Sequence, residues 1–204
     1  MTKFLHNKLI ATDLARLKAI REALKNYQRV VWLDADFLIF TPDQFILPND
    51  TELPEGYALG REVWVQPETE RQGKLRAHVK VHNAFLLFDR QNSFLDFYLE
   101  HARRLLEQCN GAVPPQFIGP KLLTALHNIV RCPVFEPAGM FSPAVIEDLL
   151  SDGEQLCALN LMKKRSQVPI AGANLCHSLA YSSGRTEDEM LRLTSLLISN
   201  GCAI

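Results

Sequence analysis

Two carboxylates interrupt an otherwise apolar run, residues 30–40 (VVWLDADFLIF). An unpaired buried carboxylate is very costly, so Asp34 and Asp36 must meet a cation, accept hydrogen bonds or lie where the strand emerges. In extended backbone, side chains two residues apart point the same way. The pair can therefore converge on one hard divalent cation, Mn²⁺ or Mg²⁺, which prefers oxygen ligands. A cation held by two carboxylates keeps positions for a substrate diphosphate.

A second interpretation of this pair needs no metal. The two aspartates can end a strand and cap a neighbouring helix and turn. A bare Asp-x-Asp pair is common by chance, but the apolar residues on both sides favour a functional one, because a fold tolerates charge there only at a cost.

Helices and strands that could position the pair alternate along the chain, which predicts an α/β fold. The patterns predict helices over residues 12–27 (with Thr12 as N-cap), from 92 to 108, over 119–128 and from 186 onward. Asn92 and Ser93 are expected to cap the second of these helices. Strands are expected as two short buried pieces flanking the polar interruption within 30–40, near 57–65 and over 82–89. Residues 66–80 are expected to form a mobile polar loop, and residues 130–184 to be irregular with short elements. Thr186 and Glu189 form a capping box for the last helix.

Length and charge narrow the class of protein. The 204 residues are expected to form a single domain over 1–204. A net charge of −1 and a pI near 6.6 give no general attraction to nucleic acid. No apolar run approaches the roughly 20 residues that cross a bilayer, so any membrane attachment is expected to be peripheral. Five widely spaced cysteines predict reduced thiols and a cytoplasmic location rather than a disulfide framework.

Residues 30–40 resemble the DXD strand of GT-A glycosyltransferases, in particular the retaining enzymes related to glycogenin and bacterial galactosyltransferases. They are also similar to the DXD strand of the Och-type mannosyltransferase and clostridial-toxin groups. Those families place a helix with an Asp and an Arg just before that strand, and residues 11–16 (ATDLAR) stand there. Residues 83–89 (NAFLLFD) resemble the strand that lines the donor sugar. Residues 119–124 (GPKLLT) resemble the Gly-Pro-x-x-x-Thr start of a helix in the Och-type group. Residues 173–178 (ANLCHS) resemble the late His-containing segment that closes on the metal and diphosphate in those families.

The resemblance covers residues 11–183 in family order, and it implies a GT-A-like fold with a mixed central sheet. It implies a Mn²⁺ or Mg²⁺ site formed by Asp34, Asp36 and His177, with His177 as third ligand or diphosphate contact. It also implies substrate contacts from five residues: Asp13, Arg16, Asn83, Gly119 and Ser178.

The roles follow the family. Arg16 contacts donor phosphate or sugar, Asp13 holds Arg16 or a sugar hydroxyl, and Asn83 contacts the donor sugar. Each also has a plainer interpretation. Asp13 and Arg16 can be a surface ion pair, Asn83 can satisfy backbone groups at a strand start, and His177 can be structural. Trp32 is interpreted as a core residue.

The implied function is a metal-dependent glycosyltransferase of hexosyltransferase type. It moves a sugar from a nucleotide-sugar to an unidentified glycan, lipid-linked or protein acceptor, with retention implied by the resemblance alone. No carboxylate can be named as nucleophile. Only about ten residues precede the Asp/Arg helix, where relatives carry a nucleoside-binding part. The expectation is a reduced nucleoside pocket, a pocket supplied by a partner, or a truncated reading frame. The Lys-Pro-Trp or Ser-Trp ending of those families is also absent.

Two other functions remain open. A haloacid-dehalogenase-type phosphatase also uses an apolar strand ending in Asp-x-Asp, with one Asp as nucleophile. Phosphatases of that group carry Thr or Val at the position of Leu38, and their later acidic Gly-Asp-x-x-x-Asp motif is absent from this sequence. The other is a non-catalytic partner that keeps the GT-A-like fold.

Overall fold

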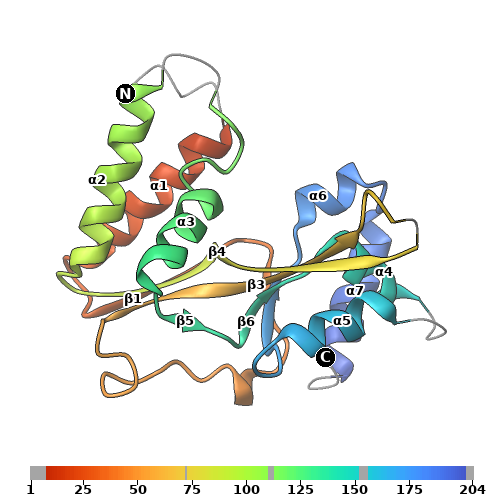
Figure 1. The fold of residues 1–204 in the computed structure, drawn as a ribbon. Coiled ribbons are helices and arrows are strands. Elements are labelled where there is room, and N and C mark those ends of the chain that lie inside the picture. Colours follow the sequence, from red (N-terminus) through yellow and green to blue (C-terminus); the bar gives the residue numbers. More distant parts are fainter. Residues whose placement is uncertain (1–7, 72, 110–112, 152–155, 201–204) are drawn as a thin grey trace. The chain divides into compact units, whose positions relative to one another are not determined.

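The computed structural model describes residues 8–71, 73–109, 113–151 and 156–200. Helices and strands are both present and their order is mixed, with strands β1 to β4 following one another, which is compatible with the predicted α/β class (Figure 1). The chain divides into two compact units, each built from three segments. Unit 1 comprises residues 1–33, 48–59 and 81–134, and unit 2 comprises residues 34–47, 60–80 and 135–204. Each unit is described by itself.

The helices are α1 (Lys8–Ala23), α2 (Ser93–Gln108), α3 (Pro120–Val130), α4 (Pro143–Leu150), α5 (Cys157–Arg165), α6 (His177–Ser182) and α7 (Glu187–Asn200), with a short 3-10 helix, η2 (Pro42–Gln44). The strands are β1 (Arg29–Leu33), β2 (Phe37–Ile39), β3 (Tyr57–Pro67), β4 (Leu75–Asp89), β5 (Val134–Phe135), β6 (Ala138–Met140) and β7 (Gly172–Asn174). One sheet has the order β1-β4-β3-β5 and the other the order β2-β7-β6.

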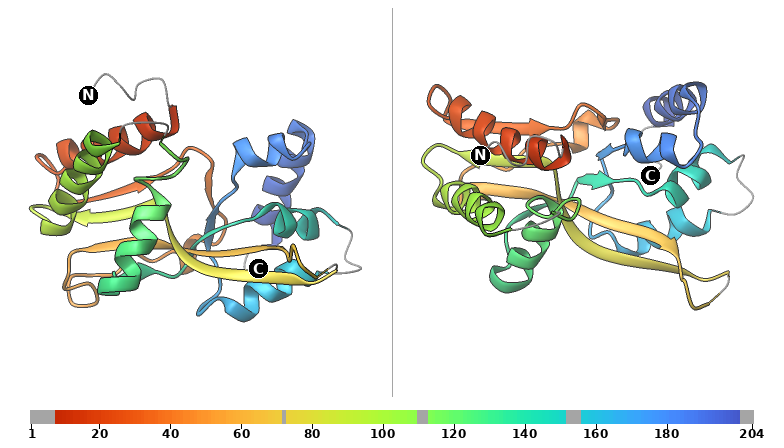
Figure 2. Two further views of the ribbon diagram at one scale, coloured as in Figure 1. Left: turned by 45° about the horizontal axis from the view of Figure 1, so that its top comes forward. Right: turned by 90° about the horizontal axis from the view of Figure 1, so that it is seen from above.

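Unit 1 is held together by an apolar core between its strands and helices. β1 runs antiparallel to β4, with Val30 opposite Phe88 and Trp32 opposite Leu86. Helices α1 and α2 lie side by side in all views (Figure 1, Figure 2). Their buried residues recur every three or four positions, the spacing that places side chains on one helix face: Ile10, Asp13, Leu17 and Ile20 in α1, and Leu95, Tyr98, Leu99, Ala102 and Leu106 in α2.

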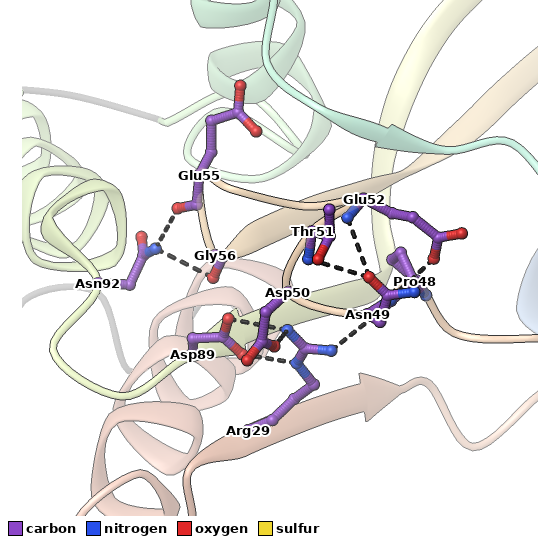
Figure 3. Close-up of polar contacts among 10 residues, drawn as sticks. All are labelled: Arg29, Pro48, Asn49, Asp50, Thr51, Glu52, Glu55, Gly56, Asp89 and Asn92. Carbon is purple, nitrogen blue, oxygen red and sulfur yellow. Dashed lines mark hydrogen bonds and ion pairs between the residues drawn. The ribbon is translucent and has the colours of Figure 1, made fainter.

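Arg29 fixes the loop that precedes β3 to the ends of β1 and β4 (Figure 3). Its Nε and Nη2 donate to the two carboxylate oxygens of Asp89 at 2.6 and 2.9 Å. Its Nη1 donates to the carbonyl of Pro48 at 2.6 Å, and Nη2 also reaches Asp50. The hydrogen bond that Arg29 donates to Asp89 is the main cause of the raised pKa of Arg29. Such a two-pronged pair fixes direction as well as position, so the loop is anchored at one point.

Unit 2 builds its core around the mixed sheet β2-β7-β6. β2 is antiparallel to β7, whereas β6 is parallel to it. Helices α4, α5 and α7 contribute the fully buried residues Val145, Met162 and Leu193. The predicted capping box of α7 is confirmed, because Glu189 N donates to Thr186 Oγ1 at 3.3 Å and Thr186 N donates to Glu189 Oε2 at 2.8 Å.

Two local predictions were wrong. Helix α1 begins at Lys8, and Thr12 is not its N-cap, since its hydroxyl donates to the Lys8 carbonyl inside the helix at 2.8 Å. Residues 66–80 do not form one loop, because β4 begins at Leu75, where Leu75 and Ala77 pack on the unit 2 core. The described residues of 130–184 form short elements, as predicted: three helices of 8, 9 and 6 residues and three strands of 2, 3 and 3 residues.

The described cysteines Cys109, Cys132, Cys157 and Cys176 are free thiols, as predicted, and Cys202 lies outside the described residues. None of the helices in the described ranges has both the length and the apolar character needed to cross a membrane.

Candidate functional site

The residues singled out from the sequence fall into two groups. Four lie in unit 1: Asp13, Arg16, Asn83 and Gly119. Four lie in unit 2: Asp34, Asp36, His177 and Ser178. Each group is described within its own unit.

The unit 1 group is a buried cluster of hydrogen-bonded polar side chains. Asp13 Oδ1 accepts from Arg16 Nη1 and from Asn83 Nδ2, both at 2.8 Å. Asp13, Arg16 and Asn83 are only 8%, 6% and 6% exposed. The alternative of a surface ion pair is therefore wrong. Asn83 lies inside β4 rather than at a strand start, and its amide reaches a carboxylate from another element.

Aromatic residues surround the charged part of this cluster. The Arg16 guanidinium carbon lies 5.6 Å from the centre of the Trp32 ring, a cation–π contact. Trp32 is half-buried and packs against the core, as predicted, and it also supports Arg16. The Tyr98 hydroxyl donates to the Ile118 carbonyl at 2.7 Å. Burial, and next the charge of Asp13, raise the pKa of Tyr98 well above its ordinary value, so this phenol stays protonated.

Gly119 closes the cluster at the start of α3, for which it is the N-cap. A Cβ built on Gly119 would lie 2.6 Å from Asp13 Oδ2 and 2.8 Å from Asn83 Nδ2. Asn83 Nδ2 is held by its hydrogen bond to Asp13 Oδ1, and Asp13 Oδ2 cannot move without turning the carboxylate that accepts from Arg16 and Asn83. Glycine is therefore required here because the backbone approaches two buried polar side chains closely.

We expect Gly119→Ala to lower the free energy of unfolding by about 2 kcal/mol, because overpacking forces buried groups apart. Urea denaturation monitored by circular dichroism measures the loss. Gly73→Ala is the control, since a methyl added there meets nothing within 4 Å and reports only the backbone cost at its positive φ. A Gly119→Ala protein as stable as the wild type would show that the cluster accommodates a methyl group at this position without strain.

The unit 2 group begins at the turn between β1 and β2. Phe37 N donates to the Asp34 carbonyl at 2.9 Å, which closes a turn over residues 34–37. The two strand pieces flanking a polar interruption are confirmed, although they are mostly half-buried rather than buried, and Asp36 lies in the turn that begins at Asp34 rather than in a continuous strand. The argument that residues two apart point the same way therefore does not apply to this pair.

Asp36 is tied to the segment that links β7 to α6. Its Oδ1 accepts from Asn174 Nδ2 at 2.6 Å, and its Oδ2 accepts from the backbone N–H of His177 at 3.0 Å. Its carbonyl accepts from Leu175 N at 2.9 Å. Asn174 in turn accepts from Cys176 N at 2.7 Å, so the amide is held at both ends. The carboxylate of Asp36 thus has one fixed orientation, and it caps α6 as the metal-free interpretation expected.

His177 and Ser178 are the first two residues of α6, next to Asp36. His177 reaches Asp36 through its backbone, while its ring packs edge-to-face on Tyr181 with centroids 4.4 Å apart. Ser178 is exposed in α6, and its hydroxyl makes no hydrogen bond within the described ranges. Across those ranges, no three His, Cys, Asp or Glu side chains are grouped to hold a metal ion. The expected three-ligand set of Asp34, Asp36 and His177 is therefore not formed.

Two titratable residues beside this turn were missed from the sequence. Cys176 has φ 49°, and its pKa is raised to about 12 by burial first, then by the charges of Asp36, Glu62 and Asp34. The thiol therefore stays protonated near neutral pH. Glu62 is 7% exposed in β3, and its pKa is raised by burial, against which Lys80 at 3.8 Å acts. The sequence feature that could have identified Glu62 is its place as the single acidic residue in the mostly apolar strand 57–65.

We expect Glu62→Gln to be more stable than the wild type at pH 7, with the difference vanishing near pH 4. Because the folded state raises the pKa of Glu62, folded protein holds its proton more tightly than unfolded protein. The wild type therefore loses stability as pH rises from the ordinary Glu pKa through the raised one. Urea denaturation across this range measures the difference. Glu70→Gln, at an exposed position, should show no such trend. A Glu62→Gln protein less stable at pH 7 would mean that Lys80 outweighs burial.

The unit 2 residues fit the divalent metal that the resemblance implies, but only as an open site. Asp34 and Asp36 offer hard oxygen donors, and a carboxylate oxygen that accepts one hydrogen bond still has a lone pair. Mg²⁺ typically binds one or two carboxylates and completes its shell with water and substrate phosphates. The two aspartates suit that arrangement and not a closed cage of protein ligands.

No protein-family model matches the chain, and no curated protein or solved structure matches it significantly. The comparisons therefore neither support nor oppose the resemblance to GT-A glycosyltransferases.

Proposed function

We propose that the chain is a glycosyltransferase that takes a sugar from a nucleotide-sugar donor with the help of Mn²⁺ or Mg²⁺. The observation that carries the proposal is the unit 1 cluster. The resemblance assigned Asp13, Arg16 and Asn83 to the donor, and Asn83 stands 70 residues from Asp13 in the chain. These three side chains form one hydrogen-bonded cluster, closed by the Gly119 that the resemblance also assigned.

The cluster holds a guanidinium in a fixed orientation. Asp13 binds one side of Arg16 and the Trp32 ring supports its face. A guanidinium held in this way loses little freedom when it binds phosphate or sugar oxygens, for which its rigid fork of donors is suited. Asp13 is thus assigned to hold Arg16, and Asn83 is assigned to the sugar.

In unit 2, Asp34 and Asp36 would hold the metal, and Asn174 and the His177 N–H would keep the Asp36 carboxylate oriented. When bound, the metal would offset the negative charge on the departing nucleoside diphosphate. This proposal names no nucleophile, and retention rests on the resemblance.

A thermal-shift screen of UDP- and GDP-sugars with and without Mn²⁺ identifies the donor, because a ligand that binds only folded protein raises its apparent stability. Mass spectrometry then follows sugar release or transfer from the nucleotide-sugar that raises the apparent stability. We expect turnover in the wild type and in Asp43→Asn, a change at an exposed acid, and none in Asp34→Asn. Phosphate-ester hydrolysis blocked by beryllium fluoride, without nucleotide-sugar turnover, would instead assign the chain to the phosphatases.

A further inference from the structure

A cavity of about 420 Å³ lies in unit 1, where the end of α1 meets the start of α2. Leu24 and Leu95 form its apolar part, and both are core residues with exposures of 5% and 2%. Its volume lies within the range of small-molecule sites. None of the residues assigned to the donor or to the metal lines it.

The charged side chains that line this cavity are mostly positive. They are Arg21, Lys25 and Arg90, against a single carboxylate, Asp96. The whole chain carries a net charge of −1, so this excess of positive charge is local. A cavity with one sign of charge concentrates ligands of the opposite sign.

Two of the three cations are free to take a ligand. Lys25 is already paired with Glu22 at 2.6 Å. Arg90 Nε donates to the Tyr27 carbonyl at 3.2 Å, which orients its guanidinium and leaves both Nη groups uncommitted toward the described residues. Arg21 has no ion pair or hydrogen bond to any side chain in the described ranges. Two arginines with available N–H groups are suited to a phosphate.

The start of α2 is not what attracts the ligand. Two of its free N–H groups are satisfied internally, because the Asn92 side chain accepts from Phe94 N at 3.1 Å and from Leu95 N at 3.3 Å. The arginine side chains are therefore the groups that would bind an anion, and replacing them tests the site directly.

We propose that this cavity binds an organic phosphate monoester, with the phosphate on Arg21 and Arg90 and the carbon part on Leu24 and Leu95. A phosphate monoester carries a charge of about −2 at neutral pH, and the two available arginines offer it two positive charges. The ester is either a soluble metabolite or the headgroup of an anionic lipid. The site is independent of the proposed nucleotide-sugar site.

Calorimetry of the full chain at low salt, without metal or nucleotide, tests the proposal with glycerol 3-phosphate. Cosedimentation with phosphatidylcholine vesicles, with or without phosphatidic acid, tests the lipid source. Arg21→Gln should weaken binding about tenfold, the effect of losing one charge-assisted hydrogen bond. Arg103→Gln removes the same charge from an exposed position on α2 and should bind as the wild type does.

Binding of either probe that Arg21→Gln weakens and Arg103→Gln leaves intact supports the site, and the probe that binds identifies the source. Three results overturn it: no binding of either probe, unchanged binding by Arg21→Gln, or equal losses in the two variants. None of these results bears on the glycosyltransferase proposal, because neither donor nor metal is present.

Discussion

Asp13→Ala is expected to lower the free energy of unfolding by about 3–5 kcal/mol, because it leaves a buried guanidinium without its carboxylate. Asp13 accepts from both Arg16 and Asn83, and both of those donors are nearly inaccessible to water. Water therefore replaces the lost oxygen only poorly for either side chain. Few single substitutions in this chain should do more damage.

Urea denaturation with a double variant shows whether this loss comes from the stranded charge. Asp13→Ala combined with Arg16→Met removes the charge as well as its partner, so the double variant should recover much of the stability lost by the single one. The same experiment on the exposed pair of Glu22 and Lys25 should show changes below about 1 kcal/mol. A loss of less than about 1 kcal/mol in Asp13→Ala would contradict the buried ion pair.

Asp36→Asn is expected to weaken metal-dependent nucleotide binding by about 100-fold or more, since changes even outside the ligand set cost 10–100-fold. It should also lower stability by about 1–3 kcal/mol, because one of the two donors facing Asp36 loses its acceptor. The sequence alone predicted unchanged or slightly higher stability, on the assumption that two like charges repel in the absence of metal. The hydrogen bonds from Asn174 and His177 reverse that expectation.

Calorimetry at a temperature where every variant is folded separates the two effects of Asp36→Asn. Asn174→Ala removes one donor that orients Asp36 but leaves the carboxylate, so it should lose stability and weaken nucleotide binding by about tenfold, less than Asp36→Asn does. Asp43→Asn changes an exposed acid and should match the wild type in both. Undiminished metal-dependent binding in Asp36→Asn would remove Asp36 from the metal site.

Features set by neighbouring residues were predicted well from the sequence. The capping box of Thr186 and Glu189 and the cap formed by Asn92 are interactions across two or three residues, which a pattern reveals directly. The two strand pieces around Asp34 and Asp36 follow from the apolar run. The first half of strand β4 was missed because residues 66–80 are mostly polar, although Leu75 and Ala77 pack on the unit 2 core.

Features set by tertiary contacts could not be read from the sequence. Asp36 meets Asn174 and His177 across 138 and 141 residues, and nothing local indicates that a backbone N–H rather than an imidazole would face it. The order of motifs in the resembling families indicated Asp13, Arg16, Asn83 and Gly119. The burial and close approach that make Asp13 and Gly119 critical are seen only in the structure. The cavity at the end of α1 joins residues that are far apart in the chain, and no motif marks it.

The most direct test of the central claim is calorimetry of UDP and GDP binding to the wild-type chain, with Mn²⁺ and then with excess chelator. Because Asp34 and Asp36 offer only hard oxygen ligands, we expect a nucleoside diphosphate to bind in Mn²⁺ and not in chelator. We also expect Asp34→Asn to abolish the binding seen in Mn²⁺. Nucleotide binding that is undiminished in chelator, or unchanged by Asp34→Asn, would contradict the proposal.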